Sequence, residues 1–489
     1  MARRFRTHLL LALLALACAE GWNRWNLRAM QASPVARQQV RDGWSVMAVD
    51  DASYLQGAER LLGTRPDLEQ GPMAVRPDLR PPGYGLLYLL PRLLLQPLPA
   101  VRALVWLQVL LYAAAVALLW EALVQARVRP AIRWPLALAF AAMPTFHGFL
   151  HYTLTEGVTP SLALLVLCCA LRAADAPRPW LRVGLIAWGL LLLTRPALGW
   201  AGLALLPALR ARGWRRAAAS AALAAGPLLG WWAFNALRAG APIGLHPVYR
   251  TDEPGINRPM HGAFWALAKS WGARGDAFHG VMEPAFRAAL AGDTAARYAD
   301  GYLALAPPGL LTAPEEQAIR SAFAAWQRFN ATELAPALGG PHGTVVGPTA
   351  SEQRILSSLH GITAGWRAAH PFHHHVRVPL RVLRGMVAHS NLNLWMFQHT
   401  LRGKAWAEAL RWASALLHIG LLLCVPLAAL LRVPRPLRLM AAGACPYLFY
   451  LAYVQRGVEE RYTLPVLFIG VACAAFVMGR RDAEAPRTH

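Results

Sequence analysis

Long apolar stretches, separated by short segments rich in arginine, dominate the pattern of the chain. Several have lengths near the ~20 residues that a helix needs to cross a bilayer. The pattern predicts ten membrane-spanning helices, at about 6–20, 101–123, 134–150, 157–173, 183–194, 197–209, 217–237, 409–431, 437–454 and 463–479. The expected fold class is therefore an all-α polytopic membrane protein.

The arginine clusters between these stretches orient the chain. Lysine and arginine accumulate on the cytoplasmic side of membrane proteins, which places every cluster inside and both chain ends inside. The clusters are Arg127, Arg129 and Arg133; Arg172, Arg178 and Arg182; Arg210, Arg212, Arg215 and Arg216; Arg432, Arg435 and Arg438; and Arg480 and Arg481. Residues 1–20 also have the shape of a signal sequence, either retained as an anchor or cleaved near Ala17-Cys18-Ala19. In both cases the residues that follow lie outside.

Two further apolar segments do not fit as crossings, because either crossing would put an arginine cluster on the wrong side. These segments, 82–98 and 376–397, are predicted to lie in the outer interface. The expected organisation is a transmembrane region at 1–238 with a first external loop at 21–100, an external region at 239–407, and C-terminal transmembrane helices at 408–489. The second external region is expected to form a small, mainly helical cap.

Composition supports this class and excludes others. Hydrophobic residues make up 56% of the 489 residues and charged residues only 15%, against roughly 25% charged in soluble domains, so a soluble enzyme is excluded. The net charge of +23 would suggest nucleic acid in a soluble chain. Here much of the positive charge lies in the clusters beside the apolar stretches, and no nucleic-acid partner is expected. The six cysteines lack metal-ligand spacing and are interpreted as core residues.

Ionisable residues gather at the predicted outer face. Such residues near a membrane are costly and usually functional. Arginines bind phosphate oxygens with paired donors, and a carboxylate can act as a base or a metal ligand. The alternatives are a helix cap for the acidic pair and a local salt bridge for Glu459-Glu460-Arg461. The candidates are Asp50, Asp51, Arg80, Glu156, Arg195 and Arg461.

A histidine-rich segment lies in the second external region. His370 and the run His373-His374-His375 invite a metal site, but adjacent helical residues point in different directions and cannot converge on one ion. An interfacial basic segment is the preferred interpretation.

Several motifs occur in an order that resembles a known family. The run from Asp50 to Gly63, then Arg80-Pro81-Pro82-Gly83-Tyr84, is similar to the first external loop of the GT-C glycosyltransferases. That superfamily includes the protein O-mannosyltransferases, the aminoarabinose transferases of lipid A and rhizobial-lipopolysaccharide-type transferases. Similar landmarks follow in the family's order: Thr155-Glu156, Leu193-Thr194-Arg195-Pro196 and Arg461-Tyr462-Thr463-Leu464-Pro465. The resemblance covers residues 1–240 well and 405–479 loosely.

The resemblance implies roles for the matching residues. Asp50 or Asp51 would deprotonate the acceptor or bind a metal, and Arg80 would contact the phosphate of a polyprenyl carrier. Relatives often have lysine in place of Arg80, and many have aspartate in place of Glu156. A divalent cation, Mg or Mn, held by Glu156 and Asp51, is an expected cofactor, and no other is expected.

The predicted function is an inverting, membrane-bound glycosyltransferase of the cytoplasmic membrane with its active face outside. It would move a sugar from a polyprenyl-phosphate donor to a hydroxyl group of a lipid, glycan or protein acceptor. Arg80, with Arg195 or Arg461, would bind the carrier phosphate. The alternatives are a flippase for lipid-linked saccharides and a family member that has lost catalysis. A transporter needs polar residues near the midplane, whereas these residues lie at one face.

Overall fold

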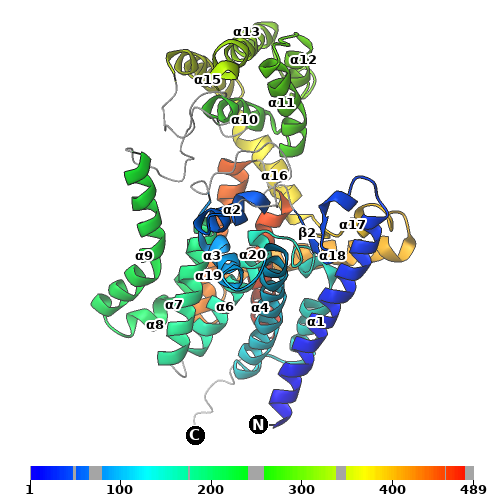
Figure 1. Ribbon diagram of the computed structural model, residues 1–489. Coiled ribbons are helices and arrows are strands. Elements are labelled where there is room, and N and C mark those ends of the chain that lie inside the picture. Colours follow the sequence, from blue (N-terminus) through cyan, green and yellow to red (C-terminus); the bar gives the residue numbers. More distant parts are fainter. Residues whose placement is uncertain are drawn as a thin grey trace.

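The computed structural model describes residues 2–47, 51–64, 80–173, 177–239, 258–337, 349–456 and 459–479. Within them the chain is almost entirely helical, with a helical bundle and a separate group of helices above it (Figure 1). The predicted fold class, an all-α polytopic membrane protein, is confirmed.

The N-terminal half builds most of the bundle. Its two short strands, β1 and β2, pair antiparallel, with Val40 opposite Val46. The elements are α1 (Ala2–Gln31), η1 (Arg37–Gln39), β1 (Val40–Arg41), β2 (Ser45–Val46), α2 (Asp51–Leu61), α3 (Gly83–Arg92), α4 (Pro97–Gln125), α5 (Pro130–Ala142), η2 (Pro144–Phe146), η3 (Thr155–Gly157), α6 (Thr159–Arg172), α7 (Pro177–Thr194), η4 (Pro196–Leu205), α8 (Leu206–Arg210) and α9 (Trp214–Ala239).

The second half forms the upper helices and completes the bundle. The upper group consists of α10 (Pro259–Trp271), α11 (Gly275–Leu290), α12 (Arg297–Leu303), α13 (Ala313–Phe329), η6 (Asn330–Leu334), α14 (Ala335–Ala337) and α15 (Ala350–Ala369). The return to the bundle consists of η7 (His373–Arg377), α16 (Val378–Val387), α17 (Trp395–Gln398), α18 (Ala405–Leu430), α19 (Arg435–Tyr450), η8 (Leu451–Gln455), η9 (Glu460–Thr463) and α20 (Leu464–Gly479).

Six helical segments among the described residues are long and apolar enough to cross a membrane, by length and composition. They are Pro97–Gln125, Thr155–Arg172, Trp214–Leu237, Ala405–Leu430, Arg435–Gln455 and Glu460–Gly479. The segments containing α6 and α20 lie at the centre, because 83% of the apolar window of each is buried, whereas α9 has only 6% buried. Each of the six corresponds to a predicted span.

The other four predicted spans have different structures. The first lies within the longer helix α1, and the prediction of a span at 134–150 is wrong in extent because α5 ends at Ala142. Pro144 follows, and the chain continues as a 3-10 turn, since proline disfavours helix in the residue before it. The predicted hairpin 183–194 and 197–209 is present as α7 followed by η4 and α8.

The second arm of this hairpin is mostly a 3-10 helix. Such a helix rises about 2.0 Å per residue, so η4 and α8 together extend about 27 Å, close to the ~30 Å hydrocarbon thickness. Trp188 donates a hydrogen bond to the Gly199 carbonyl at 3.0 Å, and a Cβ at Gly202 would collide with the Trp188 ring. These glycines therefore let the indole of α7 pack directly against the backbone of η4.

The two predicted interfacial segments form short helices. Helix α3, ten residues long, extends about 15 Å and is too short to cross. In the second segment α16 ends at Val387, and an irregular stretch separates it from α17.

The upper helices, within residues 258–337 and 349–369, form the helical cap that the sequence predicts. Their own apolar core is built on fully buried aromatic side chains, among them Phe264, Trp271, Phe278, Tyr302 and Phe323. Thr312 and Glu315 form a capping box at the start of α13, which satisfies backbone donors there. Because this core is separate from that of the bundle, the cap is a folded unit rather than a linker.

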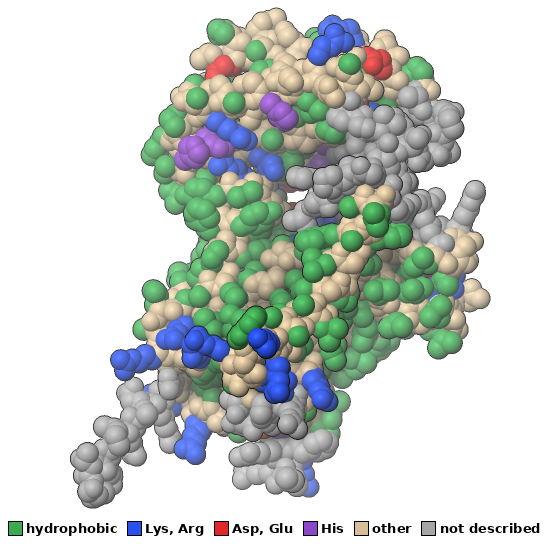
Figure 2. Space-filling view, turned by 90° about the vertical axis from the view of Figure 1, so that its left-hand side faces the viewer, with side chains coloured by type: hydrophobic (Ala, Val, Ile, Leu, Met, Phe, Trp, Pro, Cys, Tyr) green, Lys and Arg blue, Asp and Glu red, His purple; other side chains and the backbone are tan. Residues whose placement is uncertain are grey.

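The ends of several helices meet at the lower end of the bundle. His8 near the start of α1 lies 2.6 Å from Glu121 near the end of α4, and the Arg129 amide donates to the carbonyl of Gly479, the last residue of α20. Figure 2 shows basic side chains at this end, below a broad apolar belt. Four arginines line one cavity of about 1030 Å³ there: Arg182, Arg212, Arg216 and Arg435.

The orientation in the membrane is a prediction with a direct test. Reporter fusions after Gly57 and near Ala350 should report the outside, because the arginine clusters occupy the opposite end. Fusions after Arg129, Arg215 and Arg435 should report the inside. Accessibility of single cysteines at the same positions provides an independent measurement. A cytoplasmic position 57 would remove the proposed external site.

Candidate active site

Glu156 is the centre of a polar site at the cap end of the bundle. It lies in η3, at the start of α6, and is 4% exposed. Its Oε1 lies 2.7 Å from an Nη of Arg195 and 3.7 Å from Nε of Arg461. Three predicted residues from distant parts of the chain therefore form one ion-pair network.

Local sequence explains how these three side chains are presented. The 3-10 turn of η3 precedes α6, whose second residue is Pro160, a residue favoured in the first turn of a helix. Arg195 occupies the break between α7 and η4, where Pro196 begins the new helix. Arg461 lies in the 3-10 turn η9 that leads into α20. Each charged residue is thus placed at the end of a bundle helix.

Arg461 has a second acidic partner. Its Nε lies 2.6 Å from the Glu459 carboxylate, so the local salt bridge considered as an alternative is present together with the longer-range pair to Glu156. Glu460, between them, points elsewhere and pairs with His389.

Tyrosine rings contact two of the predicted arginines, Arg80 and Arg195. The Arg80 guanidinium lies 4.8 Å from the ring centroid of Tyr54, which packs edge-on against Tyr84 at 5.5 Å. The Arg195 guanidinium lies 4.6 Å from the Tyr462 ring centroid. Cation–π contacts of this kind attract a guanidinium to the face of an aromatic ring.

Close backbone packing joins the first external loop to the hairpin. A Cβ at Gly83 would lie 2.6 Å from backbone atoms of Leu193 and Thr194. Gly83 is three residues after Arg80 and Thr194 is one before Arg195, so this contact brings the two arginine-bearing segments together. The Tyr84 hydroxyl donates to Gln108 of α4 at 2.7 Å, and the amide of Gln108 donates to the Leu150 carbonyl at 2.8 Å.

Asp51 begins α2 and is 3% exposed. It forms an ion pair with Arg41. Burial raises the pKa of Asp51, against the opposing effect of Arg41. Asp50, the other member of the predicted acidic pair, lies outside the described residues.

The β-hairpin positions Arg41 for this pair. Val46 of β2 forms a bridge with Tyr152, and its amide donates to the His151 carbonyl at 2.9 Å. The hairpin is therefore tied to the turn that precedes Glu156. The sequence analysis missed Arg41, because a strand of two residues leaves no periodic signal.

Tyr84 lies within electrostatic range of both Asp51 and Glu156. Burial raises its pKa, and the negative charges of Asp51 and Glu156 raise it further. The charges of both carboxylates thus act on one fully buried tyrosine.

The predicted cation has limited support in side-chain geometry. Glu156 is held by arginines and Asp51 by Arg41. Among the described residues, no group of three histidine, cysteine, aspartate or glutamate side chains is placed to hold a metal ion. The two predicted ligands, Glu156 and Asp51, are thus both paired with arginines, and no step below passes through a metal ion.

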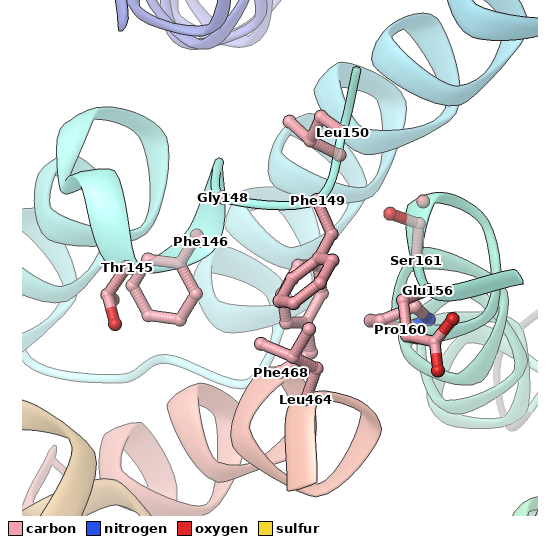
Figure 3. Close-up of a pocket in the computed structure, with 11 residues that line it drawn as sticks. Thr145, Phe146, Gly148, Phe149, Leu150, Glu156, Pro160, Ser161, Leu464 and Phe468 are labelled. Atoms are coloured by element: carbon pink, nitrogen blue, oxygen red, sulfur yellow. The ribbon is translucent and has the colours of Figure 1, made fainter. Parts of the chain in front are cut away.

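Glu156 lies at one side of a narrow, mainly apolar pocket (Figure 3). Phe149, Phe468 and Leu464 line it, and its empty volume is about 240 Å³, but no part is wide enough for a water molecule. This pocket therefore does not accept a substrate. Its apolar side chains pack beside Glu156.

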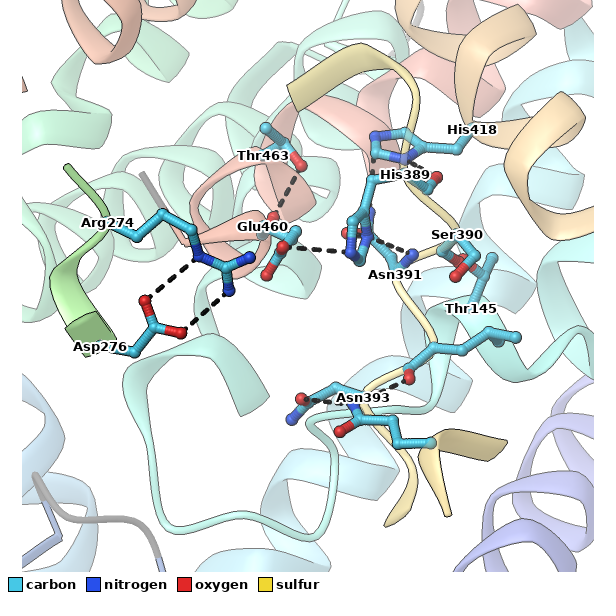
Figure 4. Close-up of polar contacts among 12 residues, drawn as sticks. Thr145, Arg274, Asp276, His389, Ser390, Asn391, Asn393, His418, Glu460 and Thr463 are labelled. Carbon is cyan, nitrogen blue, oxygen red and sulfur yellow. Dashed lines mark hydrogen bonds and ion pairs between the residues drawn. The ribbon is translucent and has the colours of Figure 1, made fainter. Parts of the chain in front are cut away.

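A second polar network includes Glu460, the residue before Arg461 (Figure 4). Glu460 pairs with His389 at 3.1 Å, His389 contacts Asn391 at 3.2 Å, and Asn391 approaches His418 at 3.5 Å. Arg274 of the cap lies opposite Glu460 in the same view. The irregular stretch after α16 thus contacts the start of the last span through the pair of His389 with Glu460.

Comparisons with known proteins give two solved structures. No family model and no curated protein matches the chain. The chain is similar to ArnT from Cupriavidus metallidurans in the apo state, at 15% identity over 87% of this chain and 72% of that chain, with a TM-score of 0.30. It is also similar to the same protein bound to undecaprenyl phosphate, at 15% identity over 96% and 77%, with a TM-score of 0.29. Likenesses of this size assign no role to any residue.

Proposed function

We propose that the chain is a glycosyltransferase that moves a sugar from a polyprenyl-phosphate carrier to a hydroxyl group of an envelope acceptor. The supporting observation is the meeting of Arg195 and Arg461 at buried Glu156. The sequence motifs select these residues independently, from the hairpin and the last span, and the chain folds so that they meet.

Three arginines are proposed to bind the phosphate of the carrier. Arg80, Arg195 and Arg461 would supply three guanidinium groups to the carrier phosphate. Guanidinium groups bind phosphate with two parallel hydrogen bonds. In a site shielded from water, they stabilise the charge that develops on the leaving phosphate. Glu156 is a positioning residue, because it holds two of the arginines.

Asp51 is the proposed base. It would accept the proton of the acceptor hydroxyl as the oxygen bonds to the anomeric carbon of the sugar. The bond between that carbon and the phosphate oxygen breaks, and the polyprenyl phosphate leaves with the electron pair. A single displacement of this kind inverts the anomeric centre. A pKa raised by burial makes this carboxylate a stronger base than an exposed aspartate.

We further propose that the site faces outward from the cytoplasmic membrane. The arginine-lined cavity at the opposite end of the bundle supports this orientation, since basic residues mark the cytoplasmic side. Acceptors of three kinds fit an outward site: a lipid, a glycan or a protein.

The Arg80 series tests the proposal. Purified protein with a polyprenyl-phosphate sugar and a panel of acceptors should release free polyprenyl phosphate, measured by mass spectrometry. Arg80→Ala should reduce this release about 10- to 100-fold, the effect of losing hydrogen bonds to a charged group. Arg80→Lys should restore much of it if a point charge suffices.

Arg102→Ala is the matched control, because Arg102 is an exposed arginine whose partner is Asp42. It should leave the release unchanged. Movement of the intact carrier across sealed vesicles, with no release for any acceptor, would replace the transferase with the flippase.

A further inference from the structure

A second group of basic side chains lies where the cap meets the bundle. It consists of Lys269 on α10, Arg367 on α15, His374 in η7 and Arg456 after η8. These four residues are called the junction cluster below. They come from four separate elements and none belongs to the site around Glu156.

The contacts of the junction cluster are to neutral groups. Arg456 is 9% exposed, and one of its Nη atoms lies 2.6 Å from Nδ1 of His374. Its Nε donates to the Tyr453 carbonyl at 2.7 Å. Arg367, half-buried, donates to the Ser270 hydroxyl at 3.1 Å.

The charges within the cluster repel one another. Burial lowers the pKa of Lys269, and nearby Arg367 and Arg456 lower it further. Burial, with the same two arginines, lowers the pKa of His374 to about 3. His374 is therefore neutral, and its Nδ1 accepts the hydrogen bond from Arg456.

No carboxylate among the described residues forms an ion pair with Lys269, Arg367 or Arg456. Buried charges normally carry a partner, because an uncompensated charge out of water costs several kcal/mol. Three positive charges sharing one partly buried region are thus arranged for an anion from outside the protein.

The backbone around the cluster is unusual in two places. His374 lies in the π-helix η7, and Arg456 follows the π-helix η8. Single turns of π-helix occur frequently at functional sites. Arg456 itself has φ +56°, a left-handed conformation that is uncommon for residues other than glycine. Backbone strain of this kind persists where the surrounding structure fixes the residue, and it is found most often at active sites and ligand-binding sites.

We propose that the junction cluster binds a phosphate monoester carried by the lipid acceptor. A phosphate monoester bears a charge of about −1.5 to −2 at neutral pH, which matches the excess of positive charge. The two arginines supply paired donors and Lys269 supplies a point charge. This inference rests on the proposed function, since it names the acceptor of the same reaction.

The position of the cluster fits an acceptor rather than the carrier. Two members, Lys269 and Arg367, belong to the cap, whereas the arginines proposed for the carrier belong to the bundle and its first loop. Arg456 precedes Arg461 by five residues, and both lie between α19 and α20. The phosphate of the acceptor and the phosphate of the carrier would therefore bind close to each other. A lipid lying between cap and bundle could then present its hydroxyl group to the site.

The test uses the full-length protein in detergent, with thermal unfolding and native mass spectrometry. The probes are phosphatidic acid, which carries a phosphate monoester, phosphatidylcholine, which does not, and inorganic phosphate. Phosphatidic acid should bind and raise the melting temperature, and phosphatidylcholine should not. In Lys269→Gln/Arg456→Gln the affinity for phosphatidic acid should fall at least about tenfold.

A second readout separates binding from a structural role. Without lipid, the same double variant should be as stable as the wild type or more stable, because the change removes repulsion between buried cations. The control is Arg328→Gln/Arg354→Gln, which removes two exposed positive charges from the cap. It should bind phosphatidic acid like the wild type.

Three results would overturn the inference. The first is an equal loss of phosphatidic acid binding in the control variant. The second is a large fall in the stability of the ligand-free junction variant. The third is that inorganic phosphate, at the same concentration, raises the melting temperature as much as phosphatidic acid does, which would show that the cluster does not require a lipid. The carrier assay with Arg80 variants is independent of all three. Failure of carrier release with intact binding of phosphatidic acid would reject the transferase and leave an anion site.

Discussion

Replacing Asp51 by asparagine should reduce sugar transfer by at least ~100-fold, the usual effect of losing a general base. The substitution keeps the size of the side chain and one acceptor oxygen. It removes the negative charge that pairs with Arg41. The measurement is release of polyprenyl phosphate by purified protein, at a donor concentration that saturates the wild type.

A structural role of Asp51 predicts the same loss in the single variant, because Arg41 would be left buried without a partner. The double variant Arg41→Gln/Asp51→Asn separates the two roles. It removes both charges and should restore thermal stability, but it should stay inactive if Asp51 is the base. Recovery of activity together with stability would assign Asp51 to charge balance alone.

Asp42→Asn is the matched control for this series. Asp42 lies in the same loop, pairs with the exposed arginine Arg102, and has φ +65°, a conformation that asparagine tolerates well. Its loss should leave transfer unchanged. A similar fall in Asp42→Asn and Asp51→Asn would show that the assay reports damage to the whole loop.

The sequence was sufficient to predict that three residues of the candidate site lie at one end of the bundle. Glu156, Arg195 and Arg461 each lie where an apolar stretch ends, and helix ends at one membrane face must be neighbours in a compact bundle. Their contact could therefore be expected from topology before any coordinates. Their exact pairing could not, because both Glu156 and Glu459 are within reach of Arg461.

Other contacts in the structure could not be predicted from the sequence pattern. Arg41 meets Asp51 only because a two-residue strand is held by the Tyr152 turn. Gln108 lies within the long apolar helix α4, where composition suggests lipid or core and not a bond to Tyr84. His374 was expected at the interface, but it is buried because the cap packs down onto the bundle. Each of these contacts depends on tertiary packing.

The 3-10 arm of the hairpin shows the same limit in the fold. Apolar composition predicts that residues 197–209 are membrane-embedded, but it cannot distinguish an α-helix from a 3-10 helix when nearly every position is apolar. The choice is made by Trp188, whose indole packs against the backbone of η4 at Gly199. The span was predicted and its helix type was not.

Glu156 should have the second large effect, on stability. Replacing it by alanine leaves Arg195 without its 2.7 Å partner, in a site where Glu156 is 4% exposed. Breaking a buried ion pair by removing one member costs about 3–5 kcal/mol. Glu156→Ala should thus show markedly lower thermal stability and loss of transfer.

Glu156→Gln distinguishes a positioning residue from a metal ligand. Glutamine keeps the shape but frees the arginines from their counter-charge, so polyprenyl phosphate should stabilise this variant more than it stabilises the wild type. Thermal unfolding with and without the carrier measures the difference. A metal ligand predicts instead that the wild type responds to Mg²⁺ or Mn²⁺ and that Glu156→Gln loses this response.

Glu59→Gln is the control for Glu156→Gln. Glu59 is also a buried carboxylate that pairs with an arginine, Arg92, at 2.8 Å, but it joins α2 to α3 away from the arginines proposed for the carrier. Its loss should lower stability through the same unpaired charge, and the carrier should give it no extra stabilisation. An equal gain from the carrier in both variants would mean that polyprenyl phosphate rescues any weakened bundle, and the role of Glu156 in positioning Arg195 and Arg461 would be rejected.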